Sequence, residues 1–254
     1  MKKIIDFTVR ENRPLTDTLF FLTLYAPELP EVAAGQFVNI KVEGSPEIFL
    51  RRPISIFDAD PAAGLLYLLI KIAGKGTARL AELKKGEKLN ILLPLGNTFT
   101  LPGKEERILL VGGGVGIAPM HFLAKTLRQK GLHPELLIGV RSCSDVVLRE
   151  NLEIVAPLHC TTEDGTFGEK GFPTAHSVWR KTFDRIYCCG PDPMMRAVAD
   201  HAFRKGIACE VSLENTMACG IGACLCCVTE TQEGHKCVCT EGPVFNTKAL
   251  KWQN

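Results

Sequence analysis

Short apolar runs separated by glycine and proline fill the first hundred residues. The apolar runs lie at 19–24, 37–42, 65–72 and 89–93. The turn residues between them include Pro27, Pro30, Gly35, Gly44, Gly64 and Gly86. About six short strands at this spacing are typical of a small antiparallel barrel. We therefore expect an all-β barrel at the start of the chain.

Beyond about residue 105 the apolar runs become continuous and alternate with a helical pattern. Runs at 108–111, 136–140 and 186–189 indicate buried strands, and residues 119–130 indicate a helix. Buried strands that alternate with helices are typical of a parallel sheet covered by helices. We therefore expect an α/β domain in the middle of the chain.

The change of pattern divides the chain into three parts. Pro102-Gly103 lies between the two patterns and marks a plausible boundary. We expect a β-barrel domain over 1–101, an α/β domain over 102–210 and a small cysteine-rich lobe over 211–254. A chain of 254 residues suits two domains with a small appendage.

Composition excludes several classes of protein. The net charge is only +2, so nothing indicates binding to nucleic acid or to an anionic membrane surface. No apolar run approaches the ~20 residues that span a bilayer, and the N-terminus has no signal-peptide core. The 11 cysteines gather mostly near one end of a long chain, which favours reduced thiols over disulfides. We therefore expect a cytoplasmic protein.

The most specific motif is a set of four cysteines near the C-terminus. They are spaced Cys219-x4-Cys224-x2-Cys227-x11-Cys239. The first three match the plant-type [2Fe–2S] spacing, which is completed by a distant fourth cysteine. Glycines at 220 and 222 permit the tight bends that such a loop needs. We therefore expect these four thiolates to bind a [2Fe–2S] cluster.

Two further cysteines, Cys226 and Cys237, leave alternatives open. We prefer Cys227 to Cys226 because it keeps the x2 spacing, and Cys239 to Cys237 because a turn at 240–243 follows it. A structural zinc site is the other interpretation of the motif. Zinc sites usually pair their ligands twice as Cys-x2–4-Cys, and the second pair is absent here.

A glycine-rich turn indicates a dinucleotide site. Gly114 and Gly116 belong to a Gly-Gly-Gly-x-Gly-x-x-Pro run between a strand and a helix, where a backbone can approach a pyrophosphate. Pro119 stands where the last Rossmann glycine would be, so a plain tight turn stays an alternative. A second turn, Cys189-Gly190-Pro191, follows a later strand, and ligands bind at the carboxyl ends of such strands. By itself, Cys189 is better explained as a small buried thiol.

Together with Arg-x-x-Ser at 52–55, these motifs resemble the ferredoxin–NADP reductase superfamily. Within it the chain is most similar to the electron-transfer subunits of B-type, NAD-linked dihydroorotate dehydrogenases. That likeness rests on the runs at 51–56, 74–77, 162–168, 219–224 and 241–245. The superfamily implies a barrel that binds a flavin and a second domain that binds a nicotinamide nucleotide.

The resemblance implies a set of FAD-binding residues in the barrel. An arginine fork suits a pyrophosphate, and a hydroxyl can hydrogen-bond near the reactive ring of the flavin. The alternatives are a solvated arginine pair at 51–52, ordinary barrel core at 69–71 and a simple turn at 76–77. The implied residues are Arg52, Pro53, Ile54, Ser55, Leu69, Ile70, Lys71, Gly76 and Thr77.

The resemblance places the nicotinamide nucleotide against Gly114, Gly116 and the turn Cys189-Gly190-Pro191. Arg141-Ser142 follow the second parallel strand, where a ribose or a 2′-phosphate is usually recognised. No acidic residue ends that strand, so the residues alone leave NADPH open. The resemblance implies NAD.

The sequence shows no group of residues that could act as general acid and base on an organic substrate. We therefore expect electrons to leave this chain for a partner protein. His121 and His133 are interpreted as surface or core residues, and Glu214 as a structural ion-pair partner, with a role beside the nicotinamide as the alternative. NAD(H) transfers two electrons and the cluster one, and a flavin can convert between the two. Electron transfer is therefore expected in the order NAD(H), FAD, cluster.

The resemblance implies a partner in pyrimidine biosynthesis. That partner is an FMN-containing catalytic subunit that interconverts dihydroorotate and orotate, in a heterotetramer of two chains each. Other interpretations are a ferredoxin–NADP transhydrogenase or sulfide dehydrogenase subunit, a hydrogenase or sulfite reductase subunit, and a non-catalytic zinc-bearing interaction module.

Overall fold

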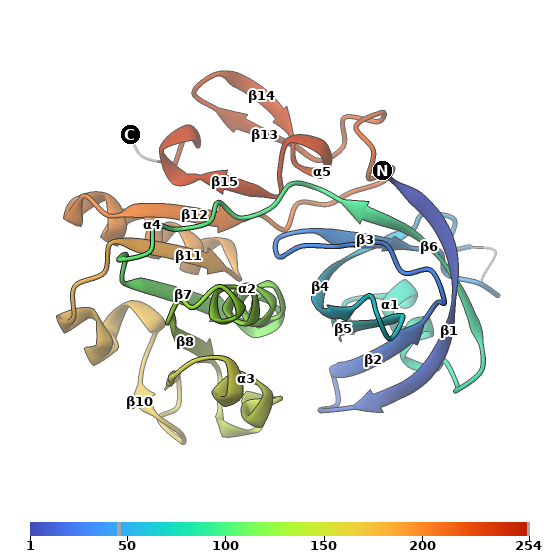
Figure 1. Ribbon diagram of the computed structural model, residues 1–254, viewed down its shortest axis with the longest axis horizontal. Coiled ribbons are helices and arrows are strands. Elements are labelled where there is room, and N and C mark those ends of the chain that lie inside the picture. The colour runs from blue at the N-terminus through green and yellow to red at the C-terminus, as the bar shows by residue number, and fades with distance from the viewer. Residues whose placement is uncertain (45–46, 253–254) are drawn as a thin grey trace.

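The computed structural model describes residues 1–44 and 47–252. Six antiparallel strands close into a barrel in the order β1-β2-β5-β4-β3-β6, on the right of Figure 1. The strands are β1 (Lys3–Pro14), β2 (Leu19–Tyr25), β3 (Phe37–Ile40), β4 (Arg52–Asp60), β5 (Leu65–Lys71) and β6 (Lys88–Leu95). A short helix, α1 (Lys75–Ala81), connects the last two.

Alternating burial along the barrel strands explains why this part closes on itself. In β6, Leu89, Ile91, Leu93 and Leu95 are fully buried, while the residues between them are partly or fully exposed. A strand points successive side chains to opposite faces, so this alternation supplies one apolar face to the barrel interior. The prediction of an antiparallel β-barrel is confirmed.

A seven-stranded sheet forms the second part, on the left of Figure 1, in the order β10-β9-β8-β7-β11-β12-β15. Only the last strand runs antiparallel to its neighbour. The strands are β7 (Ile108–Gly113), β8 (Glu135–Val140), β9 (Leu158–Thr162), β10 (Glu169–Lys170), β11 (Arg185–Cys189), β12 (Ala208–Ser212) and β15 (Val244–Asn246). The helices are α2 (Ile117–Gln129), α3 (Arg149–Val155) and α4 (Asp192–Lys205). The predicted parallel-sheet domain is confirmed.

Helix α2 packs against the barrel strand β4 as well as against its own sheet. His121 stacks on Phe57 with ring centroids 4.0 Å apart, and its Nδ1 lies 3.2 Å from the Phe57 carbonyl oxygen. Burial lowers the pKa of His121, so the ring is neutral in this apolar setting. Lys125 pairs with Asp58 at 2.7 Å beside it. His121 is thus a core residue that joins the two domains.

The C-terminal segment forms a small lobe that returns to the sheet. It contains the hairpin β13 (Val228–Thr231) and β14 (Gly234–Cys237), followed by α5 (Val238–Glu241), at the top of Figure 1. Strand β15 then pairs with β12, so the lobe is continuous with the sheet. The Asn97 amide donates to the carbonyls of Glu241 and Val244, each at 2.9 Å, which also ties the lobe to the barrel side. None of the helices within the described ranges is long and apolar enough to cross a bilayer.

Candidate functional site

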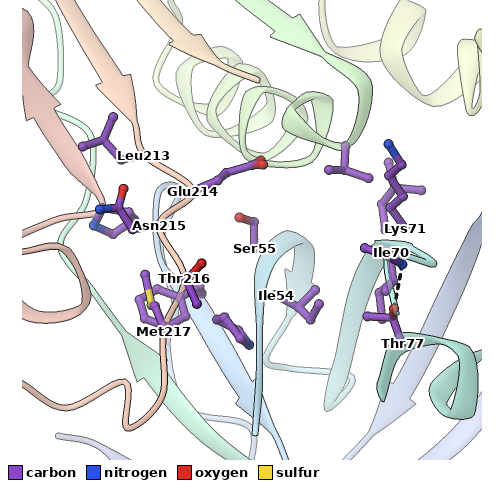
Figure 2. Close-up of a pocket in the computed structure, with 16 residues that line it drawn as sticks. Ile54, Ser55, Ile70, Lys71, Thr77, Leu213, Glu214, Asn215, Thr216 and Met217 are labelled. Carbon is purple, nitrogen blue, oxygen red and sulfur yellow. Dashed lines mark hydrogen bonds between the residues drawn. The ribbon is translucent and has the colours of Figure 1, made fainter. Parts of the chain in front are cut away.

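A cavity of about 330 Å³ lies where the barrel, the sheet and the C-terminal lobe meet. Figure 2 shows side chains from all three parts around it. Seven of the residues predicted to bind FAD line this cavity: Pro53, Ile54, Ser55, Leu69, Ile70, Lys71 and Thr77. The opposite wall is the segment 213–217, which follows β12 directly. The sequence pattern did not single out this wall, apart from Glu214.

Arg52 and Gly76 lie together next to this cavity. A Cβ atom on Gly76 would come within 2.3 Å of the Arg52 Nε, so only glycine leaves the guanidinium its place. Arg52 also donates to the Leu50 carbonyl at 2.8 Å, which holds the side chain beside the start of α1. A guanidinium beside a partly apolar cavity that carries Ser55 and Lys71 fits a flavin dinucleotide.

Arg51 has a different role from its neighbour. Its guanidinium donates to the carbonyls of Asn39 and Asn90 and to the Asn90 side chain. These bonds connect β3 to β6 behind the cavity. Arg51 therefore stabilises the barrel itself. The interpretation of Arg51 as one half of a solvated arginine pair is wrong.

Glu214 and Ser55 point into the cavity from opposite walls, as Figure 2 shows. The Cys189 thiol donates to the Glu214 carboxylate at 3.8 Å. Burial raises the pKa of Glu214, and burial raises that of Cys189 well above its ordinary value. Burial thus favours the protonated forms of both groups next to the cavity. Within the described part of the chain Glu214 forms no salt bridge, so the expectation of a structural ion pair is wrong.

The cysteine loop carries backbone N–H groups that point at sulfur. Ile221 donates to the Cys219 sulfur at 3.4 Å, Gly222 to the Cys239 sulfur at 3.2 Å, and Cys239 to the Cys227 sulfur at 3.4 Å. Burial opposes ionisation of Cys219, but hydrogen bonds from Ile221 and Cys224 lower its pKa to about 6. Because metal ligands must be thiolates, this donor set fits an iron–sulfur cluster.

The two spare cysteines have different surroundings. The Cys226 thiol is exposed and donates to the Thr216 carbonyl at 3.7 Å. Cys237 lies in β14, and burial raises its pKa, followed by the charge of Cys227. Its sulfur accepts no backbone N–H within the described residues, whereas that of Cys239 does. No three His, Cys, Asp or Glu side chains of residues 1–44 and 47–252 converge on one metal ion. In a [2Fe–2S] cluster each iron is bound by only two cysteines.

The cavity and the cysteine loop are directly connected along the chain. Met217 lines the cavity, and Cys219 is two residues further on. Two residues span at most ~7 Å, so the first cysteine lies close to the cavity wall. The Asn39 amide of β3 donates to the Cys219 carbonyl at 3.3 Å and fixes the loop to the barrel.

A second cavity, of about 410 Å³, lies at the carboxyl ends of β7 and β8. Its walls include Gly113, Gly139 and Pro191, together with the first turns of α4. Gly116 does not line it. A Cβ atom on Gly116 would meet the Cys189 carbonyl oxygen at 2.2 Å, so this glycine permits the close packing of the two predicted turns. Around Gly114 the space is open.

Two family models match the chain. The iron-sulfur cluster binding domain of dihydroorotate dehydrogenase B matches residues 214–251, and an oxidoreductase NAD-binding domain matches residues 110–200. The first match contains the cysteine loop and Glu214. The second contains the glycine-rich turn and the turn at Cys189.

Three relatives are each named dihydroorotate dehydrogenase B (NAD(+)), electron transfer subunit. That of Fusobacterium nucleatum is 36% identical, over 96% of both chains. That of Bacillus velezensis is 37% identical, over 98% of this chain and 99% of the relative. That of Desulforamulus reducens is 33% identical over the full length of both. The likeness therefore covers all three parts of the fold.

Solved structures share the architecture. A chain from the NADH-dependent reduced ferredoxin-NADP oxidoreductase, described for flavin-based electron bifurcation, superposes with a TM-score of 0.89 at 29% identity. The match covers 97% of this chain and 90% of that one. Phthalate dioxygenase reductase superposes with a TM-score of 0.62 at 23% identity, over 78% of this chain and 63% of that one, and so shows the fold alone.

Proposed function

This chain belongs to the family of dihydroorotate dehydrogenase B (NAD(+)) electron transfer subunits, and we propose from this membership which of its residues hold each redox group. It is an oxidoreductase subunit of pyrimidine biosynthesis that carries FAD and a [2Fe–2S] cluster and transfers electrons between NAD and a catalytic subunit. We infer that this partner contains FMN, that two chains of each kind assemble, and that electrons pass from dihydroorotate to NAD⁺.

The bound FAD and cluster together convert the hydride chemistry of NAD into single-electron transfer. The chain's own residues place these groups. Arg52 and Gly76 hold the flavin phosphates, and Ser55 and Lys71 border the ring. The pair Cys189 and Glu214 keeps a protonated, water-poor wall beside the position where the nicotinamide meets the flavin.

The remaining assignments follow the same division. Residues 1–101 form the FAD-binding domain, residues 102–210 the NAD-binding domain and residues 211–254 the cluster lobe. Pro53, Ile54, Leu69, Ile70 and Thr77 complete the flavin site. Gly114, Gly190 and Pro191 border the nucleotide, while Gly116 lets the two turns that hold it pack closely. The cluster ligands are Cys219, Cys224, Cys227 and Cys239.

The observation that carries this proposal is the short link between the flavin cavity and the cysteine loop. Met217 lines the cavity, and Cys219 follows two residues later. Electrons from the flavin therefore leave through the cluster to another protein.

The test is to mix the purified chain with the FMN-containing catalytic subunit. Alone, the chain should reduce ferricyanide with NADH, and it should neither bind orotate nor oxidise dihydroorotate. The mixture should reduce NAD⁺ with dihydroorotate, which is followed by the absorbance of NADH. Turnover of dihydroorotate by the single chain, or an inactive mixture with both flavins loaded, contradicts the proposal.

The TM-score of 0.89 keeps one second candidate function open, a subunit of the ferredoxin–NADP transhydrogenase type. The same preparations distinguish the two. A transhydrogenase subunit would need a different partner and would remain inactive with the FMN-containing dehydrogenase. Coupling to reduced ferredoxin, without coupling to dihydroorotate, would favour that second function.

A further inference from the structure

A buried asparagine of the barrel holds the first end of the cysteine segment, residues 219–239. The Asn39 side-chain amide donates to the Cys219 carbonyl at 3.3 Å. Asn39 is 0% exposed, and its Oδ1 has no hydrogen-bond partner within the described residues. A Cβ atom on Gly220 would lie 2.7 Å from the Asn39 Nδ2, so this glycine lets the loop approach the amide. A buried amide with an unpaired oxygen costs free energy, so burial alone does not explain an asparagine in this strand.

A second asparagine holds the other end of this segment. Asn97 lies just after β6, and its side-chain amide donates to the carbonyls of Glu241 and Val244, each at 2.9 Å. Its Oδ1 accepts from the Val244 N–H at 2.9 Å, and its own backbone N–H donates to the Gly242 carbonyl at 2.6 Å. These four hydrogen bonds of one residue fix the chain shortly after Cys239.

Both asparagines are also neighbours of residues that line the flavin cavity. Asn39 pairs in register with Pro53 on β4, and Pro53 lines the cavity. Pro243 lines it from the lobe, and a Cβ atom on Gly96, next to Asn97, would come within 2.4 Å of the Pro243 Cδ. Neither asparagine lines the cavity itself. Each one therefore joins a wall of the flavin cavity to an end of the cysteine segment.

Resting on the proposed function, we propose that Asn39 and Asn97 are positioning residues for electron transfer between the flavin and the cluster. They fix the cysteine segment against the barrel and so keep the cluster ligands at a set distance from the flavin. In this step one electron leaves the reduced flavin, which is oxidised, and enters the cluster, where one ferric iron becomes ferrous. No bond is formed or broken at the cluster, and the direction reverses when dihydroorotate supplies the electrons.

The test compares Asn97→Asp and Asn39→Leu with the matched control Asn90→Ala in the chain loaded with FAD and cluster. Asn97→Asp keeps the acceptor of the side chain and loses both bonds that its amide donates. Asn39→Leu keeps the size of the side chain and removes its donor. Asn90 carries the same amide on β6, but its side chain bonds to Asp6 and Arg51 within the barrel.

A light-generated reductant, produced by a laser flash, reduces the flavin, and absorbance then reports the transfer of an electron to the cluster. Because a shift of ~1 Å between reacting groups can cost ~100-fold in rate, this transfer should slow by ~10–100-fold in Asn39→Leu and Asn97→Asp. Pulsed electron paramagnetic resonance should show a longer or broader distribution of flavin–cluster distances in both variants. Asn90→Ala should keep the wild-type rate and distance, although the loss of its bonds lowers the unfolding midpoint.

The outcomes separate this inference from the function on which it rests. The wild-type rate and distance in both variants would overturn the role of the asparagines, and so would an equal change in Asn90→Ala. Asn97 is half-buried, so Asn97→Asp should fold and keep its iron, and this variant alone decides the test if Asn39→Leu does not fold. A wild-type chain that binds FAD and iron yet passes no electron between them contradicts the proposed function itself.

Discussion

The six cysteines between 219 and 239 differ in what their sulfur atoms accept from the backbone. Cys219, Cys227 and Cys239 each accept an N–H, whereas the Cys226 thiol donates to the Thr216 carbonyl. An N–H directed at sulfur stabilises the thiolate, which is the form that binds metal. These contacts favour Cys227 over Cys226 and Cys239 over Cys237, even though burial raises the pKa of Cys239 to about 12 in the metal-free chain.

We predict that single Ala substitutions at Cys219, Cys224, Cys227 or Cys239 remove the [2Fe–2S] signal. Electron paramagnetic resonance of the reduced chain and iron analysis provide the measurement. The matched controls, Cys226→Ala and Cys237→Ala, should keep full iron content. Iron that survives Cys239→Ala but is lost in Cys237→Ala would show that the fourth ligand is Cys237.

Arg52 is predicted to hold FAD through its guanidinium. A charge-assisted contact to phosphate contributes ~1.5–3 kcal/mol, and ~1.4 kcal/mol corresponds to one decade of affinity. Arg52→Ala should therefore weaken FAD binding at least about tenfold, as measured by flavin fluorescence during titration. Arg52→Lys should give an intermediate loss because it keeps the charge without the fork. Unchanged affinity in both variants would move the flavin phosphates elsewhere.

Glu214 is predicted to make stability depend on pH. Burial raises its pKa above the ordinary 4.5, while Lys71 and the Cys189 thiol, which face it, lower it to a smaller extent. The folded state then holds a proton that the unfolded state releases, so this group lowers stability as pH rises above about 4.5. Glu214→Gln should raise the unfolding midpoint of the FAD-loaded chain near pH 8, and the difference should shrink toward pH 4. A constant difference across that range would contradict a buried, protonated carboxyl.

Single residues also show where the sequence was insufficient. The cysteine spacing lies inside the matched iron-sulfur domain, and the Arg-x-x-Ser run borders the first cavity, because both motifs are local in the sequence. Glu214 and Cys189 are 25 positions apart, and only folding brings them to 3.8 Å.

At the scale of elements, apolar runs predicted strands only where strands are buried. The runs at 19–24, 37–42, 65–72 and 89–93 correspond to β2, β3, β5 and β6. Strand β1 was missed because most of its 12 residues are exposed, with Phe7 and Val9 fully buried. Strand β15 has only 3 residues, and its place beside β12 depends on the cluster lobe folding back. A local pattern contains no signal for such a return.

In the whole molecule, the flavin cavity lies between the turn at Cys189 and the cysteine loop. The Cys189–Glu214 contact joins the nucleotide side to the flavin cavity, and Met217 joins that cavity to Cys219. Helix α2 holds barrel and sheet together through the stacking of His121 on Phe57 and the ion pair of Lys125 with Asp58. The cysteine loop is the end of this path, and we expect the catalytic subunit to approach there.

Two exposed apolar side chains border that end. Ile221 is 47% exposed and Leu225 is 64% exposed, on either side of Cys224. Leu225 also has a positive φ of 56°, which is uncommon for a residue other than glycine. Apolar side chains next to an electron outlet fit a docking contact with the catalytic subunit.

We therefore predict that Leu225→Asp weakens assembly with the catalytic subunit at least about fivefold, the ~1 kcal/mol that marks a significant interface residue. Reduction of ferricyanide by NADH should not change, because that reaction needs no partner. Ile154→Asp is the matched control, since Ile154 is 70% exposed on α3, far from the cluster lobe in Figure 1. Size-exclusion chromatography and dihydroorotate-dependent NAD⁺ reduction measure the effect. If Leu225→Asp assembles as tightly as Ile154→Asp does, the partner approaches the cluster from another side.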